Sequence, residues 1–211
     1  MGGDWTAIMP VKRLHAAKSR LRGAVPLSRH ADLALAMVLD TATAVISVCD
    51  LIVVTDDPVT ATAVTELGAR VVPDLPGAGL NEAMRYGADE VTGLGRRRAV
   101  LAGDLPALRP AEFDAALSAV GHRAFVADAA GTGTVLLGAA AGVHLNPLFG
   151  IGSARAHAES GARALEGDWP GLRQDVDTPA DLATVLALGA GRHTCALLRD
   201  LGLKVACVPA A

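Results

Sequence analysis

The chain has 211 residues, 51% of them hydrophobic and only 3% aromatic, so it can bury one large core of alanine, valine and leucine. Its formal net charge of −3 excludes a sequence-wide basic field that would attract nucleic acid or an anionic membrane surface. No apolar run reaches the roughly 18 residues of a membrane span. The first residues also lack the basic-then-apolar order of a secretion signal, so we expect a cytoplasmic protein.

Strands and helices alternate along most of the chain, as the changes in apolar periodicity indicate. Strands are predicted at 5–11, 50–55, 69–72, 99–102, 124–127, 134–138 and 172–176. Helices are predicted at 28–47, 58–67, 80–91, 110–119, 153–165, 179–188 and 193–201, with Ser28 as the first N-cap. This order is typical of a three-layer α/β sandwich, and the turn at 131–134 adds an antiparallel pair to a mostly parallel sheet. We expect a single domain over residues 1–211.

The three cysteines, Cys49, Cys195 and Cys207, lie far apart in the sequence and are odd in number. This spacing argues against a disulfide framework and against a CxxC metal site. We therefore expect buried or inert thiols in a reducing compartment.

The central strand is predicted where four apolar residues, 99–102, run into Gly103-Asp104-Leu105-Pro106. Such a run is typical of a parallel strand covered on both faces, and Pro106 cannot continue the ladder. Ligands of open α/β sheets bind beyond the carboxyl ends of the strands, so we expect Asp104 to face the active crevice. The alternative is that Asp104 only caps the next helix.

A basic segment follows the first strand, with five Lys or Arg residues among positions 12–23. In a nucleotide-binding fold this is where a triphosphate lies, and we expect Lys12, Lys18 and Arg20 to bind its oxygens and stabilise departing pyrophosphate. Neither a Walker motif nor GxGxxG is present, which disfavours a P-loop ATPase or a dinucleotide dehydrogenase. The alternative is a solvated basic loop without a ligand.

A second acidic cluster, Asp175-Val176-Asp177, follows the last predicted strand. In an extended chain its two carboxylates point to the same side. Together with Asp104 they could hold Mg²⁺, which takes carboxylate oxygens, substrate phosphates and water as ligands. Asp177 also fits the N-cap of the helix that begins at Pro179, whereas Asp175 has no such alternative.

Two glycine-rich turns, at 131–134 and 149–153, let backbone N–H groups approach an anion, and Ser153 would add a hydroxyl at a helix start. Together they could hold a small carboxylate or phosphate. The alternative is that they only close a hairpin and cap a helix. We assign no role to His144 or His157.

Five motifs, in this order, resemble the guanylyltransferases of deazaflavin coenzyme F-420 biosynthesis over about residues 5–190. They are Met9–Leu14 with Ala17–Leu21, Leu80–Ala83, Gly103–Pro106, Phe125–Asp128 with Gly131–Thr134, and Trp169–Leu182. The last two look like the branch that uses phosphoenolpyruvate. The resemblance implies a Rossmann-like nucleotidyltransferase fold of the glycosyltransferase-A-like kind.

The resemblance also implies a reaction, in which GMP passes from GTP to phosphoenolpyruvate to give enolpyruvoyl-diphospho-guanosine and pyrophosphate. Related enzymes take 2-phospho-L-lactate or 3-phosphoglycerate. By the same resemblance, Mg²⁺ and the acceptor phosphate would be held by Asp104, Asp175 and Asp177. The acceptor, through its carboxylate, would be bound by Thr134, Gly150 and Ser153.

We accordingly predict that Asp104, Lys12 and Lys18 are catalytic. For nucleotide binding the predicted residues are Lys12, Lys18, Arg20 and Asn81, the last as a candidate for reading guanine. Two rivals remain: another nucleotidyltransferase, making a molybdenum-cofactor dinucleotide or a nucleotide sugar, and a non-catalytic nucleotide-binding protein. The expected partners are GTP and a small phosphorylated carboxylic acid, with no nucleic acid and no membrane; the oligomeric state is open, a homodimer included.

Overall fold

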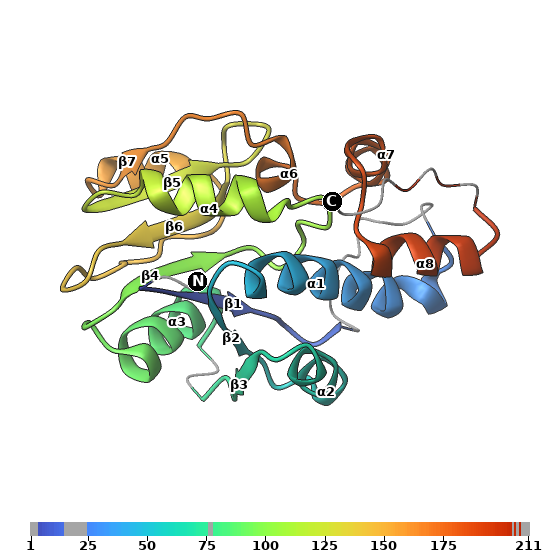
Figure 1. Ribbon diagram of the computed structural model, residues 1–211, viewed down its shortest axis with the longest axis horizontal. Coiled ribbons are helices and arrows are strands. Elements are labelled where there is room, and N and C mark those ends of the chain that lie inside the picture. The colour runs from blue at the N-terminus through green and yellow to red at the C-terminus, as the bar shows by residue number, and fades with distance from the viewer. Residues whose placement is uncertain (1–3, 15–24, 76–77, 204, 206, 208–211) are drawn as a thin grey trace.

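A seven-stranded sheet forms the centre of the computed structural model, which describes residues 4–14, 25–75, 78–203, 205 and 207 (Figure 1). In sheet order β3-β2-β1-β4-β6-β5-β7, only β6 runs antiparallel to its neighbours. The strands are β1 (Trp5–Pro10), β2 (Asp50–Val54), β3 (Arg70–Val72), β4 (Arg97–Leu101), β5 (Arg123–Ala127), β6 (Thr134–Ala139) and β7 (Arg163–Ala164). The predicted mixed, mostly parallel sheet is confirmed.

Helices cover both faces of this sheet, which confirms the three-layer α/β sandwich. They are η3 (Leu27–Arg29), α1 (His30–Ile46), α2 (Pro58–Glu66), α3 (Leu80–Arg85), η4 (Tyr86–Thr92, a π-helix), α4 (Pro110–Ala119), α5 (Ser153–Glu159), α6 (Pro170–Arg173), α7 (Pro179–Leu188) and α8 (Arg192–Asp200). Among the described residues, none of these helices has the length and apolar character needed to cross a bilayer.

Alternation of side chains along β1 builds the two cores. Ala7 and Met9 pack in a cluster with buried residues of α1 and α4, whereas Ile8 between them packs in a cluster with residues of α3 and η4. Successive residues of a strand point to opposite faces, so a single strand supplies both cores. The sheet is therefore buried on both sides, and ligands can reach it only at the ends of its strands.

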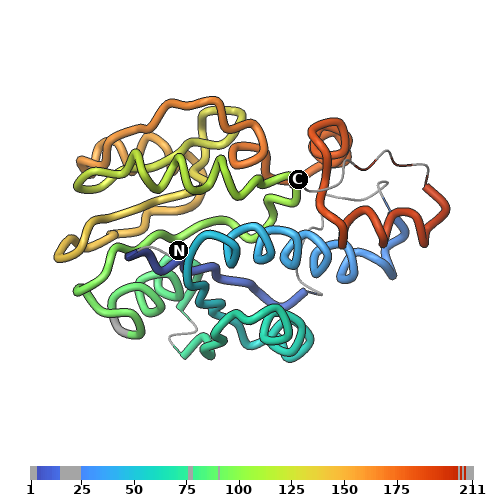
Figure 2. The backbone as a smooth tube through the Cα atoms, in the orientation of Figure 1, coloured from blue at the N-terminus to red at the C-terminus, as the bar shows by residue number. Residues whose placement is uncertain are grey.

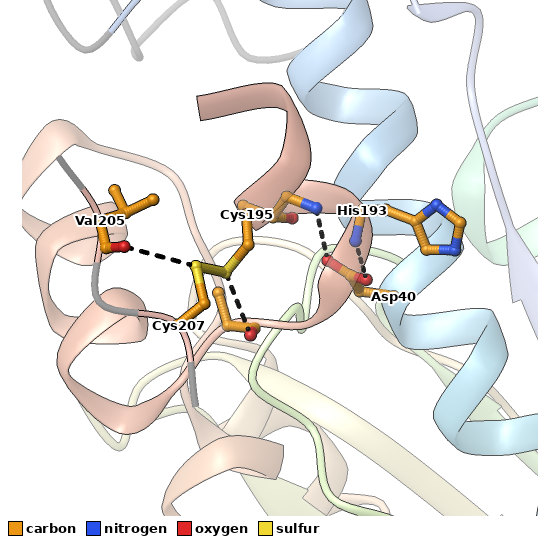
Figure 3. Close-up of a disulfide and its surroundings, with 7 residues drawn as sticks. Asp40, His193, Cys195, Val205 and Cys207 are labelled. Carbon is orange, nitrogen blue, oxygen red and sulfur yellow. Dashed lines mark hydrogen bonds between the residues drawn. A yellow bond between two sulfur atoms is a disulfide. The ribbon is translucent and has the colours of Figure 1, made fainter. Parts of the chain in front are cut away.

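The last two helices lie outside these layers; α8 packs against α1, and α7 contributes to the same buried cluster. Figure 2 shows α8, late in the chain, running beside α1, and Leu198 of α8 belongs to the same buried cluster as Leu33 and Met37 of α1. The backbone N–H groups of His193 and Thr194 both donate to the Asp40 carboxylate, each at 2.9 Å (Figure 3). Asp40 thus caps α8 from another helix.

The C-terminal tail is joined to α8 by a disulfide between Cys195 and Cys207 (Figure 3). The expectation of three separate thiols was therefore wrong for this pair. The number and spacing of the cysteines do not show that Cys207 comes back to the buried side of α8, where Cys195 lies. Cys49 is a free, buried thiol as expected, and burial raises its pKa to about 12.

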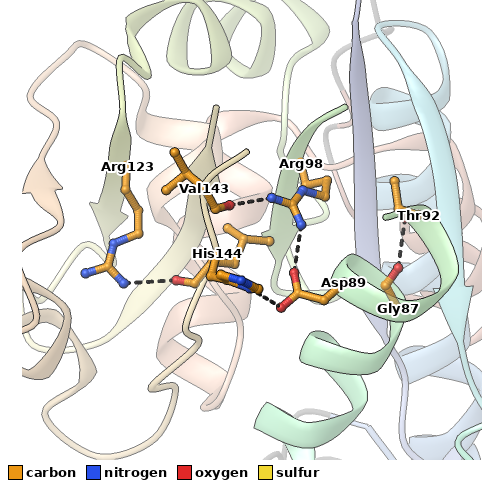
Figure 4. Close-up of polar contacts among 8 residues, drawn as sticks. Gly87, Asp89, Thr92, Arg98, Arg123, Val143 and His144 are labelled. Atoms are coloured by element: carbon orange, nitrogen blue, oxygen red, sulfur yellow. Dashed lines mark hydrogen bonds and ion pairs between the residues drawn. The ribbon is translucent and has the colours of Figure 1, made fainter. Parts of the chain in front are cut away.

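A buried arginine joins β4 to the π-helix beside it. Arg98 is fully buried, and its guanidinium donates to Asp89 at 2.7 Å and to the carbonyl oxygen of Val143 (Figure 4). His144 contacts the other oxygen of Asp89. Burial lowers the pKa of Arg98 while the charge of Asp89 raises it. Removing either partner would leave a buried charge uncompensated.

One predicted strand, 172–176, is wrong. Pro170 opens the short helix α6 there, and the N–H of Leu172 donates to the Glu112 carboxylate at 2.7 Å rather than to a neighbouring strand. A Cβ on Gly171 would lie 2.2 Å from the carbonyl oxygen of Ala107, so the chain passes too close to that backbone for any other residue. This contact depends on a segment more than sixty positions away.

Three predicted helix ends also differ. The helix after Ser28 begins at His30, because residues 27–29 form a 3₁₀ turn, and Ser28 is not its N-cap. The helix at 153–165 ends at Glu159, since Gly161 takes a left-handed φ of +86° and the chain continues into β7. The helix at 80–91 changes to a π-helix at Tyr86, where Gly87 lies against Ile8 and Val54.

We expect Asp40→Ala to lower the free energy of unfolding by about 2 kcal/mol, because it leaves two N–H groups at the start of α8, one of them buried, without an acceptor. Urea unfolding followed by circular dichroism measures this. The matched control is Asp32→Ala on the same helix, whose half-exposed carboxylate pairs with Arg29 and should matter by less than about 1 kcal/mol. Equal losses in both variants would contradict the capping role.

Candidate active site

A cavity of about 850 Å³ opens at the carboxyl ends of β1, β4 and β5. Its polar side contains seven of the residues predicted from the acidic and basic groups and the glycine turns, and α1 and α3 supply apolar walls that include Met37 and Met84. The predicted site residues in its lining are Lys12, Asp104, Thr134, Gly150, Ser153, Asp175 and Asp177. Seven residues that are far apart in the sequence therefore share one space.

Asp104 is placed in this cavity by a buried threonine of α1. The N–H of Leu105 donates to Thr41 Oγ1 at 3.0 Å, and the Thr41 hydroxyl donates to the Met37 carbonyl oxygen at 2.9 Å. Thr41 is completely buried, so no water competes for these bonds. Asp104 does not cap α4, whose N-cap is Arg109. The capping alternative for Asp104 is thus excluded.

Asp175 and Asp177 lie in the loop between α6 and α7, not at the end of a strand as predicted. Arg173 attaches this loop to the end of β5, because its guanidinium donates to the carbonyl oxygens of Ala127 at 3.2 Å and Asp128 at 3.0 Å. Thr178, rather than Asp177, is the N-cap of α7. The second acidic cluster therefore reaches the cavity on a loop that Arg173 attaches to the end of β5.

The carboxylates fit a hard divalent cation by their chemistry, because Mg²⁺ prefers oxygen ligands and keeps several waters and phosphate oxygens. Asp104, Asp175 and Asp177 line the same cavity. Within the described residues, however, no three His, Cys, Asp or Glu side chains are grouped closely enough to hold a metal ion by themselves. The protein would thus supply part of a coordination shell that substrate and water complete.

Lys12 lies at the cavity edge, half exposed, with its ammonium 3.0 Å from the Asp74 carboxylate. The chain just beyond it is held at Leu14, whose N–H donates to Asp57 at 3.1 Å. Lys18 and Arg20, the other predicted phosphate-binding residues, lie outside the described residues.

On the opposite side of the cavity, Asp128 holds the glycine-rich turn. Its carboxylate accepts from the N–H of Thr132 at 2.9 Å and from the N–H of Gly133 at 2.8 Å. A Cβ on Gly133 would lie 2.4 Å from Asp128 Oδ2, so only glycine allows this approach. Thr134 follows directly and lines the cavity.

The second turn, 149–153, is held by Asn81. The Asn81 amide donates to the Phe149 carbonyl oxygen at 3.0 Å and accepts from the Phe149 N–H at 2.7 Å. Asn81 is not among the described residues that line the cavity, whereas Gly150, Ile151 and Ser153 are. Its amide atoms are already engaged with backbone, so in this structure Asn81 supports the turn rather than reaching into the cavity.

Four supporting residues were not assigned from the sequence: Thr41, Asp128, Arg173 and His157. Thr41 had a signal, since it is a polar residue on the apolar face of the predicted helix. Asp128 stood within a motif but beside a more prominent glycine turn. Arg173 and His157 carried no local signal, because their partners are distant in sequence.

Comparison with known proteins assigns the chain to a family. The family model described as "Guanylyl transferase CofC like" matches residues 5–210. The chain belongs to this family of guanylyl transferases. Its relatives include two proteins named phosphoenolpyruvate guanylyltransferase. The one from Salinispora arenicola is 58% identical over 200 residues, which cover 92% of each chain. The one from Geodermatophilus obscurus is 54% identical over 204 residues, which cover 92% of this chain and 94% of that protein.

The fold of this CofC-like chain also matches a crystal structure described as a nucleotide-diphospho-sugar transferase from Desulfovibrio desulfuricans. The TM-score is 0.71 with 20% sequence identity, and 96% of each chain is covered. At that identity the likeness concerns the fold alone. It confirms the predicted Rossmann-like nucleotidyltransferase architecture.

His157 makes the stability of this CofC-like chain sensitive to acid. Burial, and after it the charge of Arg123, lower the His157 pKa from 6.5 to about 4, although the Ser153 backbone opposes this. The unfolded chain binds a proton below pH 6.5 that the folded chain does not. The stabilisation is thus fully present above pH 6.5 and is lost as the pH falls toward 4, by up to about 3 kcal/mol.

Urea unfolding at neutral pH and near pH 4.5 measures this loss. Because other titrating groups are common to both proteins, we compare the wild type with His157→Gln, which cannot titrate. The variant is expected to lose less stability on acidification than the wild type. Equal losses would show that His157 does not titrate in the way the burial requires.

Proposed function

We propose that this chain transfers GMP from GTP to phosphoenolpyruvate, with release of pyrophosphate, as its named relatives do. The observation that carries the proposal is the cavity in which Asp104, Asp175 and Asp177 share one space with Thr134, Gly150 and Ser153. The product would be enolpyruvoyl-diphospho-guanosine, a step that fits coenzyme F-420 biosynthesis. The described strands form one sheet, and residues from position 10 to position 177 line one cavity, which supports a single nucleotidyltransferase domain over residues 1–211.

The two ends of the cavity suit the two ends of the acceptor. Thr134 and Ser153 are buried hydroxyl residues beside the backbone of Gly150, a set that favours a small carboxylate. The aspartates suit the phosphate end only through a cation, because like charges about 4 Å apart repel by about 4 kcal/mol at an effective dielectric of about 20. This asymmetry orients the acid with its phosphate toward the nucleotide.

The reaction needs little proton transfer. An acceptor phosphate oxygen attacks the α-phosphorus of GTP, a new phosphorus–oxygen bond forms, and the bond to the bridging oxygen of the pyrophosphate breaks. The phosphate oxygen is already a nucleophile, so the site mainly has to position two anions. Among the described residues of the cavity, four are aspartates and one, Lys12, is basic.

The cation we propose is Mg²⁺, held by Asp104, Asp175 and Asp177; when bound it would screen the phosphates from one another and stabilise charge on the phosphoryl oxygens. Lys12 would stabilise the departing pyrophosphate, with Asp74 fixing its ammonium. We propose the same role for Lys18 and Arg20 on the basis of the sequence alone.

The acceptor is tested by mass spectrometry of the product formed from GTP, Mg²⁺ and each of three acids: phosphoenolpyruvate, 2-phospho-L-lactate and 3-phosphoglycerate. We expect the enolpyruvoyl product with the first. Preference for either of the others would change the acceptor and leave the chemistry intact. No release of pyrophosphate with any of them would favour the non-catalytic nucleotide-binding alternative.

We expect Asp104→Asn to lower kcat by at least about 100-fold with little change in stability, because it removes a charge at the point where phosphates meet. The assay is release of pyrophosphate from GTP and phosphoenolpyruvate. Asp114→Asn, an exposed residue on α4, is the control and should keep normal turnover. Unchanged turnover of the Asp104 variant at saturating Mg²⁺ would remove Asp104 from the mechanism.

Chelation by EDTA is expected to abolish pyrophosphate release, and added Mg²⁺ to restore it, since the carboxylates alone repel both substrates. Full activity after chelation and dialysis would contradict the metal role of the three aspartates.

A further inference from the structure

His157 lies in the wall behind the cavity and connects its two turns. Its side chain is completely buried, with Nδ1 2.9 Å from Thr134 Oγ1 and Nε2 accepting from the N–H of Leu148 at 2.9 Å. Its ring also contacts the ring of Phe149 edge-on, at 5.1 Å between centroids. One imidazole thus touches the residue that ends the first glycine turn and the residues that begin the second.

The partners decide which ring nitrogen carries the proton. A backbone N–H can only donate, so Nε2 must be the unprotonated acceptor of the Leu148 bond. Burial keeps the ring neutral at physiological pH, as its low pKa of about 4 indicates. A neutral ring with bare Nε2 carries its proton on Nδ1. Nδ1–H therefore donates to Thr134 Oγ1, which has to accept.

A threonine hydroxyl that accepts from one side still has one proton to donate. Thr134 cannot direct that proton to His157, and Thr134 is one of the residues that line the cavity. We propose that His157 is a positioning residue that forces the Thr134 hydroxyl to donate into the cavity, and so selects a ligand with an anionic oxygen there. This inference rests on the proposed function, in which that oxygen belongs to the acceptor's carboxylate.

The second turn is held by the same ring. Leu148 is fixed by His157, and the next residue, Phe149, is fixed on both backbone atoms by Asn81. Gly150 and Ser153 follow within five positions and line the cavity. His157 thereby keeps the hydroxyl of Thr134 and the 150–153 backbone on the same side of one ligand.

A double-mutant cycle tests the inference with Thr134→Val, His157→Gln and the double variant. Glutamine can accept from Leu148 but lacks a donor at the position of Nδ1, and valine keeps the shape of threonine without its hydroxyl. We expect each single variant to raise the KM for phosphoenolpyruvate about tenfold or more, because a hydrogen bond to a charged group is lost. In the double variant, the KM should rise by less than about twofold beyond Thr134→Val alone.

The KM for GTP is the internal control and should stay within about twofold in all three variants. Multiplication of the two single effects on the KM for phosphoenolpyruvate would overturn the inference. So would an equal rise in the KM for GTP, since a general loosening of the fold would affect both substrates. Unfolding curves of each variant show that the kinetics are measured on folded protein.

The tautomer is tested separately, on the wild-type chain labelled with ¹⁵N-histidine, by long-range ¹H–¹⁵N correlation spectra at neutral pH. The signal missing from His157→Gln, or from His157→Asn should the first variant not fold, assigns the ring. We expect the Nδ1–H form, and the Nε2–H form would overturn the inference. A wild type that releases no pyrophosphate with any acid would refute the proposed function, while this spectrum still decides the direction of the Thr134 hydroxyl.

Discussion

The parallel pairing of β1 with β4 at the centre of the sheet is the constraint on which the site depends. Its register sets Trp5 opposite Arg97 and Ile8 opposite Val100, so both strands end at the same edge. The basic segment leaves the first strand there and Gly103-Asp104 leaves the second. Had either strand run the other way, Lys12 and Asp104 would lie at opposite edges of the sheet.

Around that edge, three segments that line the cavity are each held by a side chain from another part of the chain. Thr41 holds the loop of Asp104, Arg173 holds the loop of the second acidic cluster, and His157 holds the turn of Thr134. These bonds lie in water-poor surroundings, where an unmade hydrogen bond is costly. Segments that are held in this way need less ordering when a ligand binds.

The C-terminal helices complete the wall formed by α1. That helix contributes Met37 to the cavity, and Met37 also belongs to the buried cluster that contains Leu198 of α8. Asp40 accepts from the first N–H groups of α8, and the disulfide at Cys195 ties the tail to the same helix. The far end of the chain therefore stabilises a helix that lines the cavity, although no residue of α8 is among the described lining.

Local sequence was sufficient for the order of the first six strands and of most helices, for the hairpin at 131–134 and for picking out acidic residues that line the cavity, because apolar period, proline, glycine and carboxylate placement are short-range signals. Tertiary structure alone decided three other features. They are the conformation of 172–176, the pairing of Cys195 with Cys207 and the contacts that His157 makes. Each depends on a partner distant in sequence or on a reversal of the chain: Gly171 against Ala107, a tail folded back on α8, an imidazole between two turns. Such contacts exist only once the sheet has brought those segments together.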